Sequence, residues 1–123
     1  MESDIELTMR QDPVVATVTS TEVRDDGSTI SAKAEMGRYG MVRFTINLES
    51  SGDRLGGKAF GGGRGALEDG SFVSGTFSGR WRREGTQLVV HGIDEVSNGD
   101  MSLIVFNLDA RGDEVTVTHY ALD

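Results

Sequence analysis

The chain has 123 residues, a formal net charge of -8 and no cysteine. This length fits one domain, and the lack of cysteine excludes disulfides, thiolate nucleophiles and cysteine-based metal sites. The spread negative charge argues against nucleic acid as a partner, and without a secretion leader or a run approaching ~20 apolar residues we expect a cytoplasmic protein with no membrane partner.

Turn-forming residues recur along the chain at close intervals. Pro13 cannot sit in a central strand, so residues 1–12 are expected to form a separate first strand or an N-terminal arm. After it, runs rich in Val, Thr, Ile and aromatic residues alternate with turn signals, for example Asp25-Asp26-Gly27-Ser28, Ser97-Asn98-Gly99-Asp100 and Arg111-Gly112-Asp113. We predict an all-β, single-domain chain spanning residues 1–123. Tight hairpins of roughly eight to nine strands favour an antiparallel up-and-down β-barrel, because a meander loses its exposed edges by closing on itself.

A glycine-rich stretch, residues 52–70, reads GDRLGGKAFGGGRGALEDG. Its letters fit part of two phosphate-binding patterns, but Ala59 follows the lysine where a hydroxyl is needed, and the residues after it cannot begin the required helix. We therefore predict a bent or bulged strand pair at a corner of the barrel, or a lid loop at its mouth.

The turns also predict which side chains face the barrel interior. A two-residue loop at Asn98-Gly99 would place Asp94 opposite Leu103. A two-residue loop around Glu84-Gly85 then brings Phe77 and Trp81 to the same face, with the Phe77 ring over Gly92. On this register the interior is apolar with isolated polar groups.

The opposite face of the last strands is also largely apolar. We expect the outer residues to form a homo-oligomer contact, because monomers rarely expose a contiguous apolar patch. Its members are Ile93, Ile104, Phe106 and Val117.

A cavity for a small, mostly apolar ligand is predicted inside the barrel, because a few polar groups in an apolar lining orient such a molecule. Asp94, with its pKa raised by burial, is the candidate general acid or base, and Tyr120 is the candidate hydrogen-bond donor. If the two are ordinary structural groups, Asp94 caps a turn or pairs with Arg80, and Tyr120 is a core phenol. The predicted ligand-binding residues are Phe77, Trp81, Val90, Leu103, Val105, Asn107 and Thr118.

The two histidines fall on one face in this register. His91 and His119, with Glu95 nearby, offer ligand types that suit iron or zinc. They would lie two strands apart, ~10 Å between backbones. We therefore predict no metal and no cofactor.

In its strand pattern the chain resembles the small barrels of the allene-oxide-cyclase-like and lipocalin-like groups. The first resemblance implies a cofactor-independent cyclase or isomerase that encloses a small hydrophobic metabolite, and the second implies a non-catalytic carrier or sensor of an apolar ligand. A third possibility is a filled barrel that acts as a protein interaction module. Fold analogy does not choose among these functions.

Overall fold

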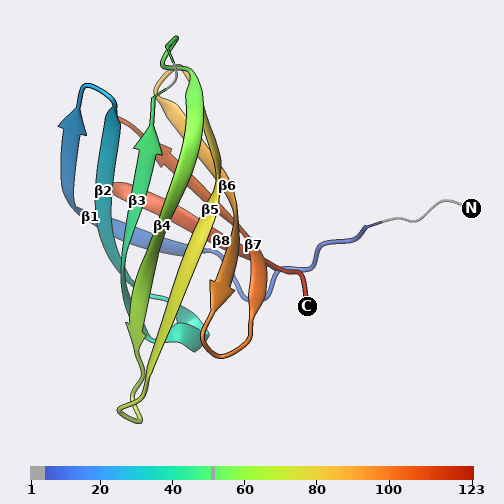
Figure 1. The fold of residues 1–123 in the computed structure, drawn as a ribbon. Coiled ribbons are helices and arrows are strands. Elements are labelled where there is room, and N and C mark those ends of the chain that lie inside the picture. Colours follow the sequence, from blue (N-terminus) through green and yellow to red (C-terminus); the bar gives the residue numbers. More distant parts are fainter. Residues whose placement is uncertain (1–4, 51) are drawn as a thin grey trace, which may run out of the picture.

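The structure is a computed structural model that describes residues 5–50 and 52–123. It is an all-β barrel (Figure 1). Its elements are β1 (Val14–Arg24), β2 (Gly27–Glu35), the 3-10 helix η1 (Gly37–Tyr39), β3 (Met41–Glu49), β4 (Gly56–Ala66), β5 (Phe72–Glu84), β6 (Gln87–Val96), β7 (Met101–Asp109) and β8 (Glu114–Ala121). No helix among the described residues is long and apolar enough to cross a membrane.

Each strand pairs with the next in antiparallel fashion, and β1 returns to β8 to close the barrel. The predicted up-and-down barrel is thus confirmed. Alternation along the strands builds the core: in β3, Val42, Phe44, Ile46 and Leu48 are buried while Arg43 is exposed. The core lies inside the barrel because side chains on a strand alternate between its two faces.

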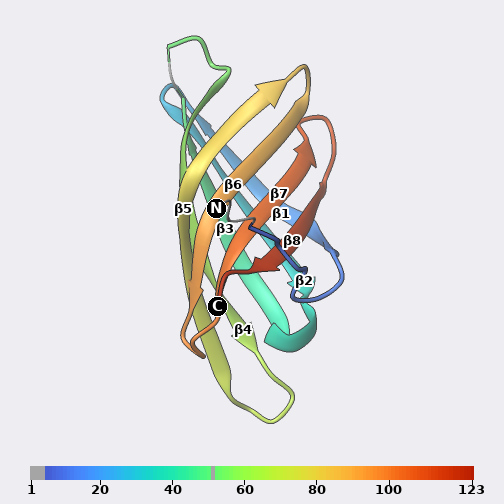
Figure 2. The ribbon, with the colours of Figure 1, turned by 90° about the vertical axis from the view of Figure 1, so that its right-hand side faces the viewer.

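The β1–β8 seam is short. Only Val14–Thr17 pairs with β8, and a register shift between Val18 and Ser20 turns the rest of β1 toward β2. At the other end of β8, residues 8–10 run alongside it: the amide of Ala121 donates to the carbonyl of Thr8, and the amide of Arg10 donates to the carbonyl of His119. Figure 2 shows this N-terminal segment on the same side of the barrel as the C-terminus. The segment covers backbone groups that β1 leaves unpaired.

Most of the glycine-rich stretch forms a strand without a bulge and not a loop. Residues 56–66 form β4, which pairs along its length with β5 and from Ala59 to Ala66 with β3. The interior leaves little room for larger side chains there: a Cβ on Gly61 would lie 2.0 Å from the carbonyl oxygen of Thr45 and 2.9 Å from Cε1 of Phe77. Hydrogen bonding on both edges and the bulk of neighbouring rings offset the low strand propensity of glycine.

The predicted register holds through β5 and β6 but is wrong at β7. Glu84 pairs with Gln87, so the two-residue turn at Gly85 is confirmed. In the next hairpin, however, Asp94 pairs with Ser102 instead of Leu103. The loop has three residues, Ser97–Gly99, closed by hydrogen bonds between Val96 and Asp100 and between Gly99 and Val96, and Gly99 has a φ of 99°. This is a turn followed by a left-handed glycine, a common three-residue hairpin.

One extra loop residue inverts the faces of β7 and β8. The buried inward residues of these strands are Ser102, Ile104, Phe106, Leu108, Val115, Val117 and His119. The predicted outer apolar patch is therefore wrong as composed: Ile104, Phe106 and Val117 belong to the core, and of its members only Ile93 is exposed, at 45%.

Candidate functional site

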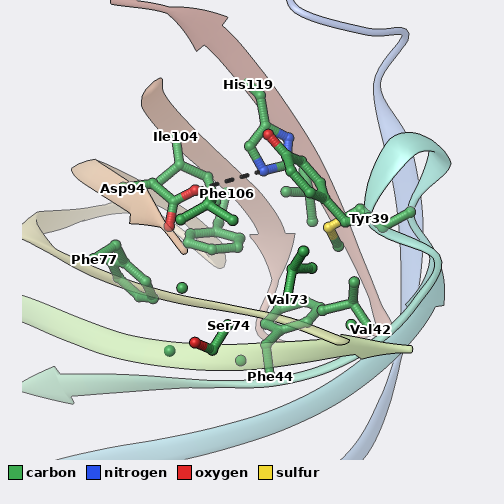
Figure 3. A pocket seen from close by; sticks show the side chains of 17 residues that line it. Tyr39, Val42, Phe44, Val73, Ser74, Phe77, Asp94, Ile104, Phe106 and His119 are labelled. Carbon is green, nitrogen blue, oxygen red and sulfur yellow. Dashed lines mark ion pairs between the residues drawn. The ribbon is translucent and has the colours of Figure 1, made fainter. Parts of the chain in front are cut away.

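A cavity of about 60 Å³ lies at the end of the barrel that carries η1 (Figure 3). Most of its wall is apolar, and β4 and β5 contribute glycines to it. The lining residues are Met36, Tyr39, Val42, Phe44, Gly62, Gly63, Gly65, Val73, Ser74, Gly75, Phe77, Asp94, Val96, Ile104, Phe106, Val117 and His119. The remaining barrel interior toward the opposite end is filled by core side chains such as Trp81, whose Nε1 donates to the carbonyl of Glu49 at 2.7 Å.

Asp94 and His119 are the two ionisable side chains that face each other in this cavity (Figure 3). Asp94 comes from β6 and His119 from β8, on either side of β7, and Oδ2 of Asp94 lies 4.0 Å from Nε2 of His119. Both are buried, with exposed fractions of 7% and 3%. At 4.0 Å the two atoms are too far apart for a direct hydrogen bond. The Nδ1 atom of His119 has no hydrogen-bond partner among the described residues.

Burial shifts the pKa values of both side chains in the directions that favour their neutral forms. Desolvation raises the pKa of Asp94 to about 6, and the negative charge of Asp100 adds to this effect, whereas Arg10 opposes it. Desolvation likewise lowers the pKa of His119 to about 4, with a further lowering by Arg10. At neutral pH the cavity therefore holds a carboxylate beside an uncharged imidazole.

Tyr39, at the end of η1, closes the cavity beside His119. The centroids of the two rings are 5.3 Å apart. The Tyr39 hydroxyl donates to Oδ2 of Asp100 at 2.8 Å, and burial together with this hydrogen bond raises the pKa of the phenol. Its hydroxyl is therefore already engaged, and the ring is what Tyr39 contributes to the wall.

Arg10 holds this end of the barrel together from outside the cavity. Its side chain donates to Oγ of Ser102 at 3.1 Å and to the carbonyl of Met101 at 2.9 Å, and it pairs with Asp100 and Asp123. The N-terminal segment, the β6–β7 loop and the C-terminus thus meet at one guanidinium. Arg fits this position because it presents several donors in a fixed plane.

The structure brings together only part of the predicted site. Phe77 and Asp94 line the cavity, whereas Trp81 and Val90 lie deeper in the filled part of the barrel. Because of the register shift, the remaining predicted residues lie on the outward face of β7 and β8; these are Leu103, Val105, Asn107, Thr118 and Tyr120. Thr118 is nevertheless buried, and Tyr120 pairs with Met9 of the N-terminal segment.

Several residues of the site were not predicted to be there, among them His119, Tyr39, Phe44 and Phe106. If the loop at Asn98-Gly99 had been assigned three residues instead of two, the predicted register would have placed His119 inside the barrel. No local signal marks Tyr39, because its position depends on the packing of η1 against the β6–β7 loop.

The predicted placement of the two histidines on one face of the sheet is wrong. His91 is exposed on the outer face of β6 and His119 is buried inside the barrel, so the two cannot share an ion. Within residues 5–50 and 52–123, no three His, Asp or Glu side chains are grouped to hold a metal.

No family model, curated protein or solved structure matches the chain. The chemistry of the cavity residues is therefore the basis for a function.

Proposed function

We propose that the barrel is a cofactor-independent isomerase or cyclase that takes a small, mostly apolar molecule into the cavity at the η1 end. The observation that supports this proposal is the buried Asp94 carboxylate, which faces an apolar cavity. Its Oδ2 atom lies 4.0 Å from Nε2 of the neutral His119. A base in such a cavity meets its substrate with little competing water, which strengthens its electrostatic effect. Cofactor-free chemistry is also what the pattern resemblance to allene-oxide-cyclase-like barrels suggests.

The proposed chemistry is proton transfer at a carbon next to a carbonyl group. An oxygen of Asp94 accepts the proton, the electron pair of the broken C–H bond moves into the enolate, and the proton returns at another carbon. His119, when its proton is on Nε2, can donate to the enolate oxygen beside Asp94. General base catalysis of this kind contributes typically ~10²–10⁴-fold to a rate.

A second candidate is a carrier that binds the same class of molecule without changing it. The engagement of the Tyr39 hydroxyl by Asp100 favours this candidate, because it leaves few polar groups to orient a substrate. The two candidates differ in whether a bound molecule undergoes proton exchange.

The test is deuterium incorporation into small enolisable ketones, such as cyclopentanone and cyclohexanone, incubated with the protein in D₂O and followed by proton NMR. We expect the wild-type protein to accelerate loss of the α-proton signal. Asp94→Asn should reduce the acceleration by about 100-fold or more. Glu114→Gln, which removes an exposed carboxylate at the start of β8, should leave it unchanged.

Equal exchange in the wild type and in Asp94→Asn would remove Asp94 from the chemistry. Ketone binding without exchange would support the carrier. Failure of the ketones to bind or exchange would contradict both candidates and leave the protein interaction module as the remaining hypothesis.

A further inference from the structure

The Asp94 carboxylate is buried without a hydrogen bond from any described residue, an arrangement that costs free energy unless a partner compensates it. Its neighbours do not supply that partner. Glu95 and Asp100 are acidic, and the side-chain contacts of Arg10 go to Asp100, Asp123, Ser102 and the carbonyl of Met101. The charge at the cavity therefore remains available to a ligand of opposite sign.

The wall around this carboxylate is rich in aromatic rings. Tyr39, Phe44, Phe77 and Phe106 all line the cavity. The ring of Phe106 lies 5.0 Å from that of Phe77 and 5.7 Å from that of Phe44, measured between centroids, so three rings form a continuous surface (Figure 3). The faces of aromatic rings carry partial negative charge and attract alkylammonium groups.

A carboxylate and aromatic rings at one small cavity are complementary to a compact organic cation. Apolar surface alone would favour a neutral hydrocarbon, but the buried charge then stays unpaired. A carboxylate ligand would be repelled by Asp94, with Glu95 and Asp100 close by. The cavity volume of about 60 Å³ limits the bound group to a small one.

We propose that this cavity binds a small alkylammonium group, with Asp94 as its counter-ion and the rings of Tyr39, Phe44, Phe77 and Phe106 as its wall. The inference shares the cavity with the proposed function and rests on that cavity's taking a small molecule, but not on proton transfer. An ammonium group paired with Asp94 would occupy the proposed base, so such a cation would act as a competitive inhibitor of proton exchange.

The test compares three probes of nearly equal shape at pH 7.5: choline, its neutral isostere 3,3-dimethylbutan-1-ol, and the anion 3,3-dimethylbutanoate. Binding is measured by calorimetry, and its location by NMR shifts of the Phe77 and His119 side chains. We expect choline to bind at least 10-fold more tightly than the neutral alcohol, and the anion to bind least. Asp94→Asn should abolish the preference for choline, whereas Glu114→Gln should keep it.

A second variant tests the contribution of the aromatic wall to choline binding. Phe77→Leu keeps an apolar side chain and Asp94 but removes one ring, so it should weaken choline binding and leave the alcohol nearly unaffected. Equal affinity for choline and the alcohol would overturn the inference while leaving a neutral ligand, and with it the proposed function, in place. No binding of choline, or binding that leaves His119 and Phe77 unshifted, would also overturn it. The proposed function is tested separately by deuterium exchange into the ketones.

Discussion

Oδ2 of Asp94 lies 4.0 Å from Nε2 of His119 inside an apolar cavity, and burial shifts the pKa values of the two side chains in opposite directions. Asp94 is shifted upward to about 6, so its neutral form is favoured by folding. This contribution to stability is present below the unfolded pKa, near 4, and is lost as pH rises through 6. His119 is shifted downward to about 4. Its contribution is present above pH 6.5 and is lost as pH falls toward 4.

Asp94→Asn should therefore stabilise the protein at pH 7.5, because the variant no longer buries a charge. A pKa shift of about two units corresponds to roughly 3 kcal/mol in the free energy of unfolding. At pH 4 the gain should largely vanish, and the variant should lose stability between pH 6.5 and 4 more steeply than the wild type, since only His119 then titrates in the cavity. Urea denaturation at both pH values measures this. An equal effect at pH 4 and 7.5 would show that Asp94 is not buried as described.

Arg10→Ala should destabilise the barrel more than a comparable substitution at the surface. Arg10 joins three parts of the chain, and its loss removes one ion-pair partner of Asp100 and the hydrogen-bond donor to Ser102. We expect a decrease in Tm of roughly 5 °C or more. Arg24→Ala is the matched control: Arg24 pairs with Glu22 and Asp26 at the exposed end of β1, where such pairs contribute little. Similar decreases for both variants would contradict the structural role of Arg10.

The extent to which the sequence predicts this fold depends on the distance over which each signal acts. Alternation and turn residues are local, and they predicted the barrel and the inward position of Phe77, Trp81 and Asp94. Register is cumulative, so one extra residue in the loop at Gly99 moved Leu103 and Tyr120 outward and His119 inward. The glycines of β4 were compatible with either a bent strand or a loop, because glycine lets the backbone turn a corner. Their place in a strand depends on neighbours distant in sequence, among them Phe77 and Thr45.

Gly61→Ala should be strongly destabilising. Its Cβ would lie 2.0 Å from the carbonyl oxygen of Thr45 and 2.9 Å from the Phe77 ring, so backbone and core would both have to move. We expect a loss of about 2 kcal/mol or more in the free energy of unfolding. Gly52→Ala, where no atom lies within 4 Å of the new methyl group, should change stability little. If thermal denaturation finds the two variants alike, β4 does not pack against Phe77 as described.

Both proposed activities of the cavity need the ionised form of Asp94, so both should depend on pH in the same sense. Because the pKa of Asp94 is raised to about 6, the fraction ionised increases through that pH. Deuterium exchange into the ketones and the affinity for choline should therefore rise between pH 5 and 7 and level off above. We attribute this increase to Asp94 after considering the charged groups around it. Arg10 is always protonated, and Glu95 and Asp100 are acidic. The pKa of His119 is lower, at about 4. In Asp94→Asn both profiles should be flat across this range. A wild-type midpoint near pH 4 for both profiles would mean that Asp94 is solvated, and it would remove the physical basis for a buried base and for a buried counter-ion alike.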